Sequence, residues 1–102
     1  MRELRVLPEV LEDTAEAANW YDKNGYPGLG NRFLAVFCAC LSHIQQEGEI
    51  YKIVYNDFRR VFIKPFPYAV YYRNYEDWVV ISLVIHTARS PVLLQKLLRE
   101  RK

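Results

Sequence analysis

Apolar residues in the first half of the chain recur at intervals of three and four, the spacing of an amphipathic helix. One such run extends from Pro8 to about Lys23, and its first turns are rich in acidic residues, which the helix dipole favours there. Its expected buried face comprises Leu11, Ala15, Ala18 and Tyr21, flanked by Val10, Ala17 and Trp20. A second run, from Gly30 to Gln46, has on one face Phe33, Phe37, Cys40, Leu41 and Ile44. The pattern predicts two amphipathic helices, and Gly48 is expected to end the second.

The segment between the two helices, NGYPGLGN (24–31), is dense in turn-forming residues. Its GLG is not a phosphate-binding loop, because the dinucleotide and P-loop motifs require a preceding strand and further glycines or a Gly-Lys-Ser/Thr step. The segment therefore predicts the turn of a helical hairpin.

From Glu49 onwards the hydrophobic period changes from about 3.6 to about 2, which marks the passage from helices to a sheet. The run WVVISLVI (78–85) is apolar except for Ser82, as expected of a strand that is covered on both faces. The expected strands are 3–7, 59–64, 68–74 and 78–85, with 50–58 as an extended connection or a short edge strand.

A short helix is expected to close the chain. Ser90 is a favourable N-cap and Pro91 suits the first helical position. The helix carries a stripe of Leu93, Leu94, Leu97 and Leu98, with Lys96, Arg99, Arg101 and Lys102 expected to face water. About three turns are marginal in isolation, so this helix must pack on its own sheet or on a second chain.

These elements predict one domain, 1–102, of the α+β class. A strand and a helical hairpin come first, the hairpin packs on one face of a mostly antiparallel sheet, and the order is β-α-α-β-β-β followed by the short C-terminal helix.

Composition and charge narrow the function. With 51% hydrophobic and 25% charged residues the chain should fold, and it has neither an apolar run of about 18 residues nor the features of a signal peptide, so a cytoplasmic protein without a membrane partner is expected. Residues 1–50 carry four basic and eight acidic groups (4 − 8 = −4), whereas residues 51–102 carry ten and four (10 − 4 = +6). The basic half favours an anionic partner, either nucleic acid or an acidic peptide.

Cysteine and histidine give little support to a metal site. Cys38 and Cys40 are two apart on a predicted helix, where their side chains diverge, and we expect them to be free thiols that are buried or half-buried. His43 and His86 are far apart in the sequence, and His43 is expected at the boundary of its helix's apolar face. Neither a metal nor a cofactor is expected.

Four segments, in order, resemble the ParE/RelE toxin superfamily, and in particular its ParE-like branch: WYD (20–22), GLGNRF (28–33), RRVFIKPFPYAVYYR (59–73) and VIHTARSP (84–91). The resemblance spans nearly the whole chain. It implies the toxin of a type II toxin–antitoxin system, of the kind associated with plasmid stabilisation. The implied partner is a cognate antitoxin with an initially disordered segment that wraps the toxin.

Two activities occur in this superfamily: ParE-like members poison DNA gyrase, and RelE-like members cut mRNA on the ribosome. Compared with the RelE-like pattern, Arg89 matches the late arginine and Arg60 roughly replaces an early lysine, but Phe62 stands where another lysine is expected and the tail 90–102 has no tyrosine. The resemblance therefore implies a gyrase inhibitor without bond chemistry. The alternatives are an mRNA interferase, with His86, Tyr72, Arg60 and Arg89 as catalytic candidates, or a non-toxic member that still binds an antitoxin.

The same residues have structural interpretations. His86 at a strand end can be a hydrogen-bonded structural histidine, and Arg89 can cap the turn or pair with an acidic side chain of the hairpin. Tyr68, Tyr71 and Tyr72 can be alternating core and surface aromatics. Partner contact is predicted for Arg73, Leu94, Leu97, Leu98, Arg99 and Arg101.

Overall fold

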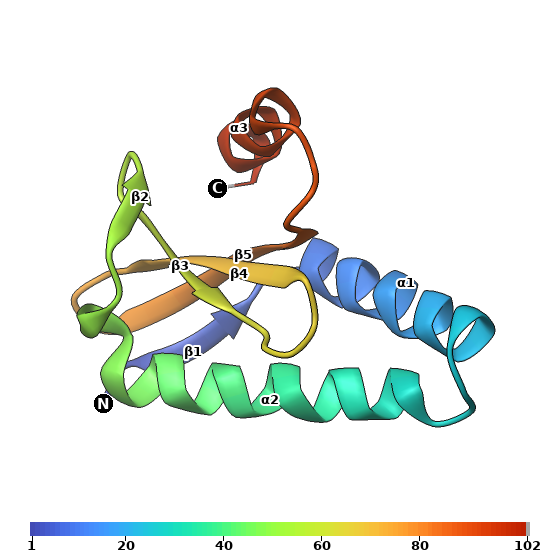
Figure 1. Cartoon of the computed structure of the whole chain (residues 1–102). Helices are drawn as coiled ribbons and strands as arrows, with labels where there is room; N and C mark the ends of the chain where they lie inside the picture. Colours follow the sequence, from blue (N-terminus) through green and yellow to red (C-terminus); the bar gives the residue numbers. More distant parts are fainter. Residues whose placement is uncertain (102) are drawn as a thin grey trace.

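The helices and strands follow the order that the hydrophobic pattern predicts (Figure 1). The structure is a computed structural model that describes residues 1–101. Its elements are β1 (Glu3–Val6), α1 (Pro8–Asn24), α2 (Leu29–Glu47), the 3-10 turn η1 (Gly48–Ile50), β2 (Ile53–Tyr55), β3 (Phe58–Phe62), β4 (Tyr68–Asn74), β5 (Trp78–His86) and α3 (Pro91–Glu100). The α+β prediction is confirmed, and 50–58 contains the short edge strand β2.

The sheet has five strands in the order β1-β5-β4-β3-β2. β1 runs parallel to β5, from the pair Glu3 and Trp78 to the pair Val6 and Ile81, and every other neighbouring pair is antiparallel. The expected mostly antiparallel sheet is therefore confirmed. Because the helical hairpin intervenes between β1 and the other strands, β1 can align in parallel with the last strand of the chain.

Helices cover both faces of this sheet. In Figure 1, α2 lies below the sheet and α3 above it. β4 divides its side chains between the faces by alternation: Val70 and Tyr72 join the core under the hairpin, whereas Ala69 and Tyr71 join a smaller cluster under α3. Residues 79 and 81–85 of β5 are all buried, so the prediction of a core strand covered on both faces is confirmed.

The buried face of α1 differs from the predicted one. Leu11 is 61% exposed and Ala15 is also exposed, so their expected burial is wrong. Ala18 is buried as predicted, and the other buried positions are Thr14 and the two flanking residues Val10 and Ala17. Thr14 takes a core position because its hydroxyl is satisfied within the helix, donating to Val10 O at 3.1 Å. The buried face is thus rotated slightly from the predicted one and includes one polar residue, Thr14.

The turn between the helices is fixed by close backbone contact. A side chain at Gly30 would place its Cβ 2.4 Å from Ala18 O, so only glycine allows this approach of the two helices. The Gly30 N–H also donates to Asp22 Oδ1 at 2.8 Å. The predicted hairpin is therefore present, and Gly28, with φ of 96°, supplies its left-handed turn residue.

α2 buries its predicted face. Phe33, Phe37 and Ile44 are buried, and Cys40 and Leu41 pack against the same core. Both thiols are free, but Cys38 is exposed, so its expected burial is wrong. Burial raises the pKa of the Cys40 thiol.

None of the helices in residues 1–101 has the length and apolar character that a membrane-spanning segment requires.

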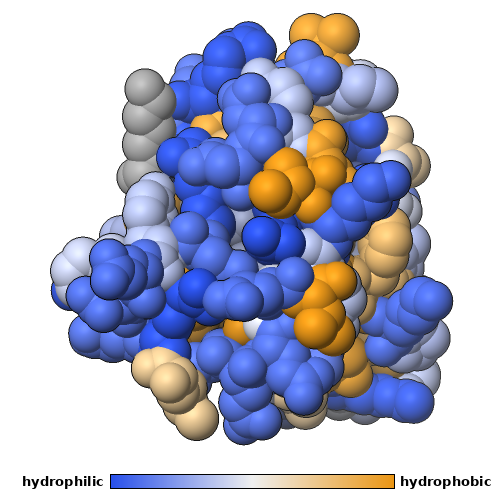
Figure 2. All heavy atoms as spheres, turned by 90° about the vertical axis from the view of Figure 1, so that its left-hand side faces the viewer, coloured by the Kyte–Doolittle hydropathy of each residue, from blue (hydrophilic) through white to orange (hydrophobic). Residues whose placement is uncertain are grey.

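The outer edge of the sheet at β2 carries scattered apolar side chains. Seen from the left-hand side of Figure 1, the surface is mostly hydrophilic with separate hydrophobic patches (Figure 2). The exposed apolar residues in this part of the chain are Ile50, Ile53 and Val54. Scattered apolar residues are normal on a protein surface, and a three-residue edge strand offers little backbone for pairing, so this edge is not a candidate site.

Candidate functional site

The edge of β5 that faces away from β4 is closed by a strand along only part of its length. β1 ends opposite Ile81, where Leu7 N donates to Ile81 O at 3.1 Å, while β5 continues to His86. Ser82 has no opposite residue in β4, since the register shifts between Tyr71 and Tyr72. In an antiparallel pair, the main-chain N–H and C=O groups of successive residues point alternately toward and away from the partner strand. From this bulge onwards, those of Ser82, Val84 and His86 point away from β4.

Two side chains close this strand-free part of the edge. The Val84 N–H donates to Asp13 Oδ2 at 3.1 Å, and Arg101 donates to Ser82 O at 3.3 Å. Arg101 also donates to both oxygens of Asp13, at 2.5 and 3.0 Å. The side chains of the pair are only 14% and 15% exposed. The expectation that Arg101 faces water is therefore wrong, because its guanidinium is needed at the sheet edge; Lys102 lies outside the described residues.

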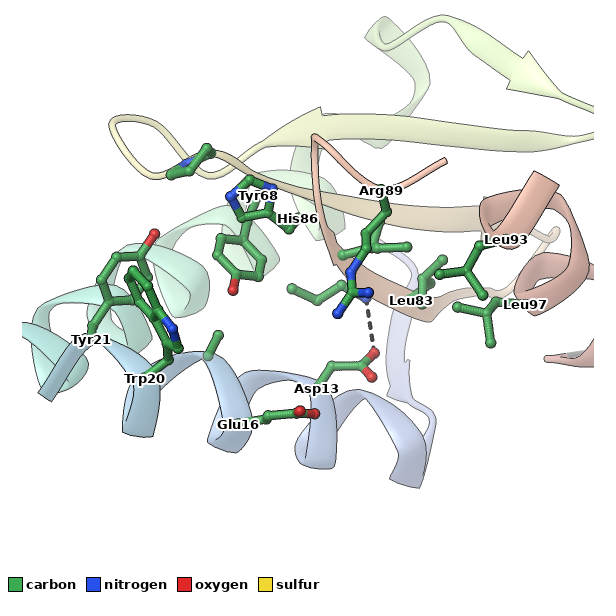
Figure 3. Close-up of a pocket in the computed structure, with 14 residues that line it drawn as sticks. Asp13, Glu16, Trp20, Tyr21, Tyr68, Leu83, His86, Arg89, Leu93 and Leu97 are labelled. Carbon is green, nitrogen blue, oxygen red and sulfur yellow. Dashed lines mark hydrogen bonds between the residues drawn. The ribbon is translucent and has the colours of Figure 1, made fainter. Parts of the chain in front are cut away.

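A groove of about 730 Å³ lies beside this pair, between α1 and α3, with the end of β5 as its floor (Figure 3). One wall is apolar and aromatic, and charged groups lie on both sides: Asp13 and Glu16 on α1, and Arg89 in the loop after β5. His86, the last residue of β5, also lines the groove. The other side chains that line it are Ala17, Trp20, Tyr21, Pro67, Tyr68, Leu83, Val84, Ile85, Leu93 and Leu97.

His86 has a structural role at the end of β5. Its Nδ1 accepts a hydrogen bond from the Ala88 N–H at 3.0 Å, and its ring meets the Tyr68 ring edge-on, with centroids 5.2 Å apart. In the neutral ring the proton therefore lies on Nε2. The sequence-based interpretation of a hydrogen-bonded structural histidine agrees with this geometry, and Nε2 remains free to donate.

Arg89 projects into the groove. Figure 3 shows its side chain pointing from the loop after β5 toward α1. The backbone N–H of Arg89 donates to His86 O at 3.1 Å. The guanidinium of Arg89 takes part in none of the three ion pairs found among residues 1–101. The expected pairing with an acidic side chain of the hairpin is therefore not made. The pKa of the Tyr68 phenol is raised by burial, an effect that the Arg89 cation opposes.

A second, smaller cavity of about 200 Å³ lies on the α3 face and brings together three of the four catalytic candidates, Arg60, His86 and Arg89. The fourth, Tyr72, is on the other face of the sheet. It is fully buried, its hydroxyl donates to Gly48 O at 2.6 Å, and burial raises its pKa to about 12. The predicted grouping of Tyr72 with the other three is therefore wrong, because alternation sends Tyr71, and not Tyr72, toward this cavity.

The predicted partner-contact residues fall into two groups. On α3, Leu98 is fully buried against the sheet, Leu94 and Leu97 pack beside it, and Arg99 is exposed. Arg73 lies on β4, where its guanidinium stacks on the Phe58 ring at 3.9 Å and its Nε is 3.2 Å from Asp57 Oδ1. α3 thus packs Leu94, Leu97 and Leu98 on its own sheet. Its N-cap is Ser90 as predicted, with Oγ accepting from Leu93 N–H at 3.1 Å.

Sequence reasoning did not find the groove. The sequence pattern places Asp13 in the acidic first turns of a helix, Trp20 beside that helix's apolar face and Tyr68 in the sheet. Their common site becomes visible only where segments far apart in the chain meet. The described part of the chain contains no group of three or more His, Cys, Asp or Glu side chains that could hold a metal ion.

No protein-family model and no curated protein sequence matches the chain. Its structure, however, is similar to a chain of a solved structure described as the chromosomal ParDE TA system from P. aeruginosa, with a TM-score of 0.77 over 84% of this chain and 96% of that chain. The chain has a ParE-like fold. The identity is 12%, so the ParE-like fold is shared while most side chains differ, and the groove must be interpreted from the residues of this chain.

Proposed function

We propose that this chain is the toxin of a type II toxin–antitoxin system, a cytoplasmic ParE-like inhibitor of DNA gyrase that a cognate antitoxin neutralises. The observation that carries the proposal is the likeness, over 84% of this chain and 96% of the other, to a chain from a ParDE TA system. The sequence resemblance supports the same branch. The basic second half, with its charge of +6, suits an acidic antitoxin segment that folds on binding.

Gyrase inhibition is preferred to RNA cleavage because the groups that cleavage needs are incomplete. Cleavage through the 2′-hydroxyl requires a base, an acid and cations around the phosphate. Tyr72 is buried with its hydroxyl bonded to Gly48 O, and His86 has only Nε2 free. Phe62 stands where the RelE-like pattern has a lysine, and residues 90–102 contain no tyrosine. These departures support an inhibitor that acts by contact.

One observation favours mRNA cleavage as a second candidate. Arg60, His86 and Arg89 line one small cavity, so two guanidinium groups and an imidazole that can donate a proton share a site. A chain with these groups but without toxicity would be the third candidate, a member that only binds antitoxin.

The test is expression in bacteria with and without the open reading frame next to the gene. We expect growth arrest, relief of that arrest by the neighbouring product, and a DNA-damage response before translation stops. The purified chain should stabilise cleaved DNA–gyrase complexes, and His86→Ala should retain this activity. Ribosome-dependent cutting of mRNA that Arg60→Ala, His86→Ala and Arg89→Ala each slow by orders of magnitude would overturn gyrase as the target. Antitoxin binding without any toxicity would identify the third candidate.

A further inference from the structure

The groove between α1 and α3 has apolar walls that are already held in place. The Tyr68 ring packs edge-on against Phe33 and His86, with centroids 5.1 and 5.2 Å away, and Tyr21 packs against Phe33 at 5.7 Å. Trp20, at the open side, is 56% exposed. A bound apolar side chain would therefore contact aromatic rings that are already ordered, so that the rings would lose little conformational entropy on binding. In such preorganised pockets a few contacts carry most of the binding energy.

Some charged side chains around these walls already form an ion pair, and others do not. Asp13 is neutralised by Arg101, as the bidentate contact shows. Arg89 lines the groove from the opposite side and has no ion pair among residues 1–101. Glu16, on the α1 side, is also unpaired within that range. An occupant with one carboxylate near Arg89 complements the groove, whereas negative charge along its whole length would meet Glu16.

This distribution separates a peptide from a nucleic acid. A nucleic-acid strand carries a charge at every phosphate and would place some of them beside the carboxylates of α1. A peptide can place a single Asp or Glu side chain on Arg89, a large apolar side chain between the aromatic wall and Leu93, and a main-chain or side-chain donor on Glu16.

We propose that this groove is the docking site for a segment of the antitoxin that combines a large apolar residue with a nearby Asp or Glu. The apolar residue fills the space between Trp20, Tyr68 and Leu93, and the carboxylate pairs with Arg89. The inference rests on the proposed function for the identity of the partner. The chemistry of the groove, by itself, defines the kind of peptide that it accepts.

A random peptide library displayed against the purified chain tests that chemistry directly. The selected peptides should carry a leucine or an aromatic residue close to an Asp or Glu. Their affinity, measured by calorimetry, should fall at least about 10-fold with Arg89→Glu and with Trp20→Ala. Matched controls are Lys96→Glu, an exposed basic residue of α3, and Leu11→Ala, an exposed apolar residue of α1; neither lines the groove, so affinity should stay within about 2-fold.

Circular dichroism of each variant verifies folding, since all four positions are exposed. Peptides without an acidic residue, equal binding to Arg89→Glu, or displacement of the peptides by a single-stranded RNA oligonucleotide would each overturn the proposal. The neighbouring gene product separates this inference from the proposed function. If that product neutralises the toxin and binds Arg89→Glu and Trp20→Ala as tightly as the parent chain, the groove is excluded while the function stands. If it does not bind the parent chain, the function falls, and the peptide selection still decides the groove.

Discussion

The two faces of the sheet are covered in different ways. Under the hairpin, two long helices pack against a large core that includes Phe33, Phe37, Val70 and Tyr72. On the other face, α3, a helix of ten residues, covers a smaller cluster. A single ion pair, between Asp13 and Arg101, holds the C-terminal end of α3 against α1. Both cavities that are lined by the candidate residues adjoin α3. Because the hairpin face buries the larger core, we expect it to supply most of the stability, while the α3 face leaves room for ligands.

The largest effect is expected from a cavity under the hairpin. Phe33→Ala removes a fully buried ring that contacts Tyr21, Phe66 and Tyr68, and it should lower the free energy of unfolding by about 3–5 kcal/mol. Urea denaturation followed by circular dichroism measures this loss. A loss below about 1 kcal/mol would show that the hairpin face is not the main source of stability.

A smaller and more local effect is expected from the ion pair on the other face. Asp13→Ala leaves Arg101 without its partner and the Val84 N–H unsatisfied, and should cost about 2–3 kcal/mol, less than a fully buried pair. Amide hydrogen exchange should accelerate in α3 more than in α2. The double variant Asp13→Ala/Arg101→Ala should cost at least about 1 kcal/mol less than the sum of the single variants. Additive losses would contradict direct coupling, and Arg99→Ala, on the exposed side of α3, should change stability by less than about 0.5 kcal/mol.

The smallest effect concerns Tyr72, whose hydroxyl joins the hairpin face to the turn after α2. Tyr72→Phe removes the bond to Gly48 O and should cost about 1 kcal/mol at neutral pH. Burial raises the pKa of Tyr72 from 10.0 to about 12, so the folded state holds this proton more tightly than the unfolded state. Its contribution is complete below pH 10 and is lost as the pH rises toward 12.

Melting temperatures recorded from pH 8 to pH 12 measure this alkaline loss. The decline should be steeper in the parent chain than in Tyr72→Phe, whereas Tyr26→Phe, which changes a half-exposed tyrosine, should follow the parent curve. Parallel curves for the parent and Tyr72→Phe would mean that the hydroxyl of Tyr72 titrates normally.

The sequence predicted the elements well because each one has a local cause. The change of period at Glu49, the Ser90-Pro91 start and the Gly-rich turn all act within a few residues. The face of α1 was predicted one position off, because hydrophobicity alone does not reveal that Thr14 can satisfy its hydroxyl inside its own helix.

The site was harder to predict because its contacts join residues that are far apart in the sequence. Asp13 and Arg101 are 88 positions apart, and nothing local to either residue specifies the other. Consecutive tyrosines at 71 and 72 show that two faces are occupied, but not which tyrosine faces the hairpin. The sequence places His86 and Arg89 near each other at a strand end, as in the structure, while no motif marks the α1 wall of their groove.

The sheet order also has a consequence for biosynthesis. Among the strands of residues 1–101, β1 pairs with β5 alone, and the paired residues Glu3 and Trp78 are separated in the sequence by the helical hairpin and three other strands. A growing chain must therefore emerge from the ribosome beyond β5 before its first strand can pair, although the helical hairpin can form much earlier from local contacts. Chains truncated before β5 would carry an unpaired strand at one end and an exposed hairpin core, and would be substrates for chaperones and proteases.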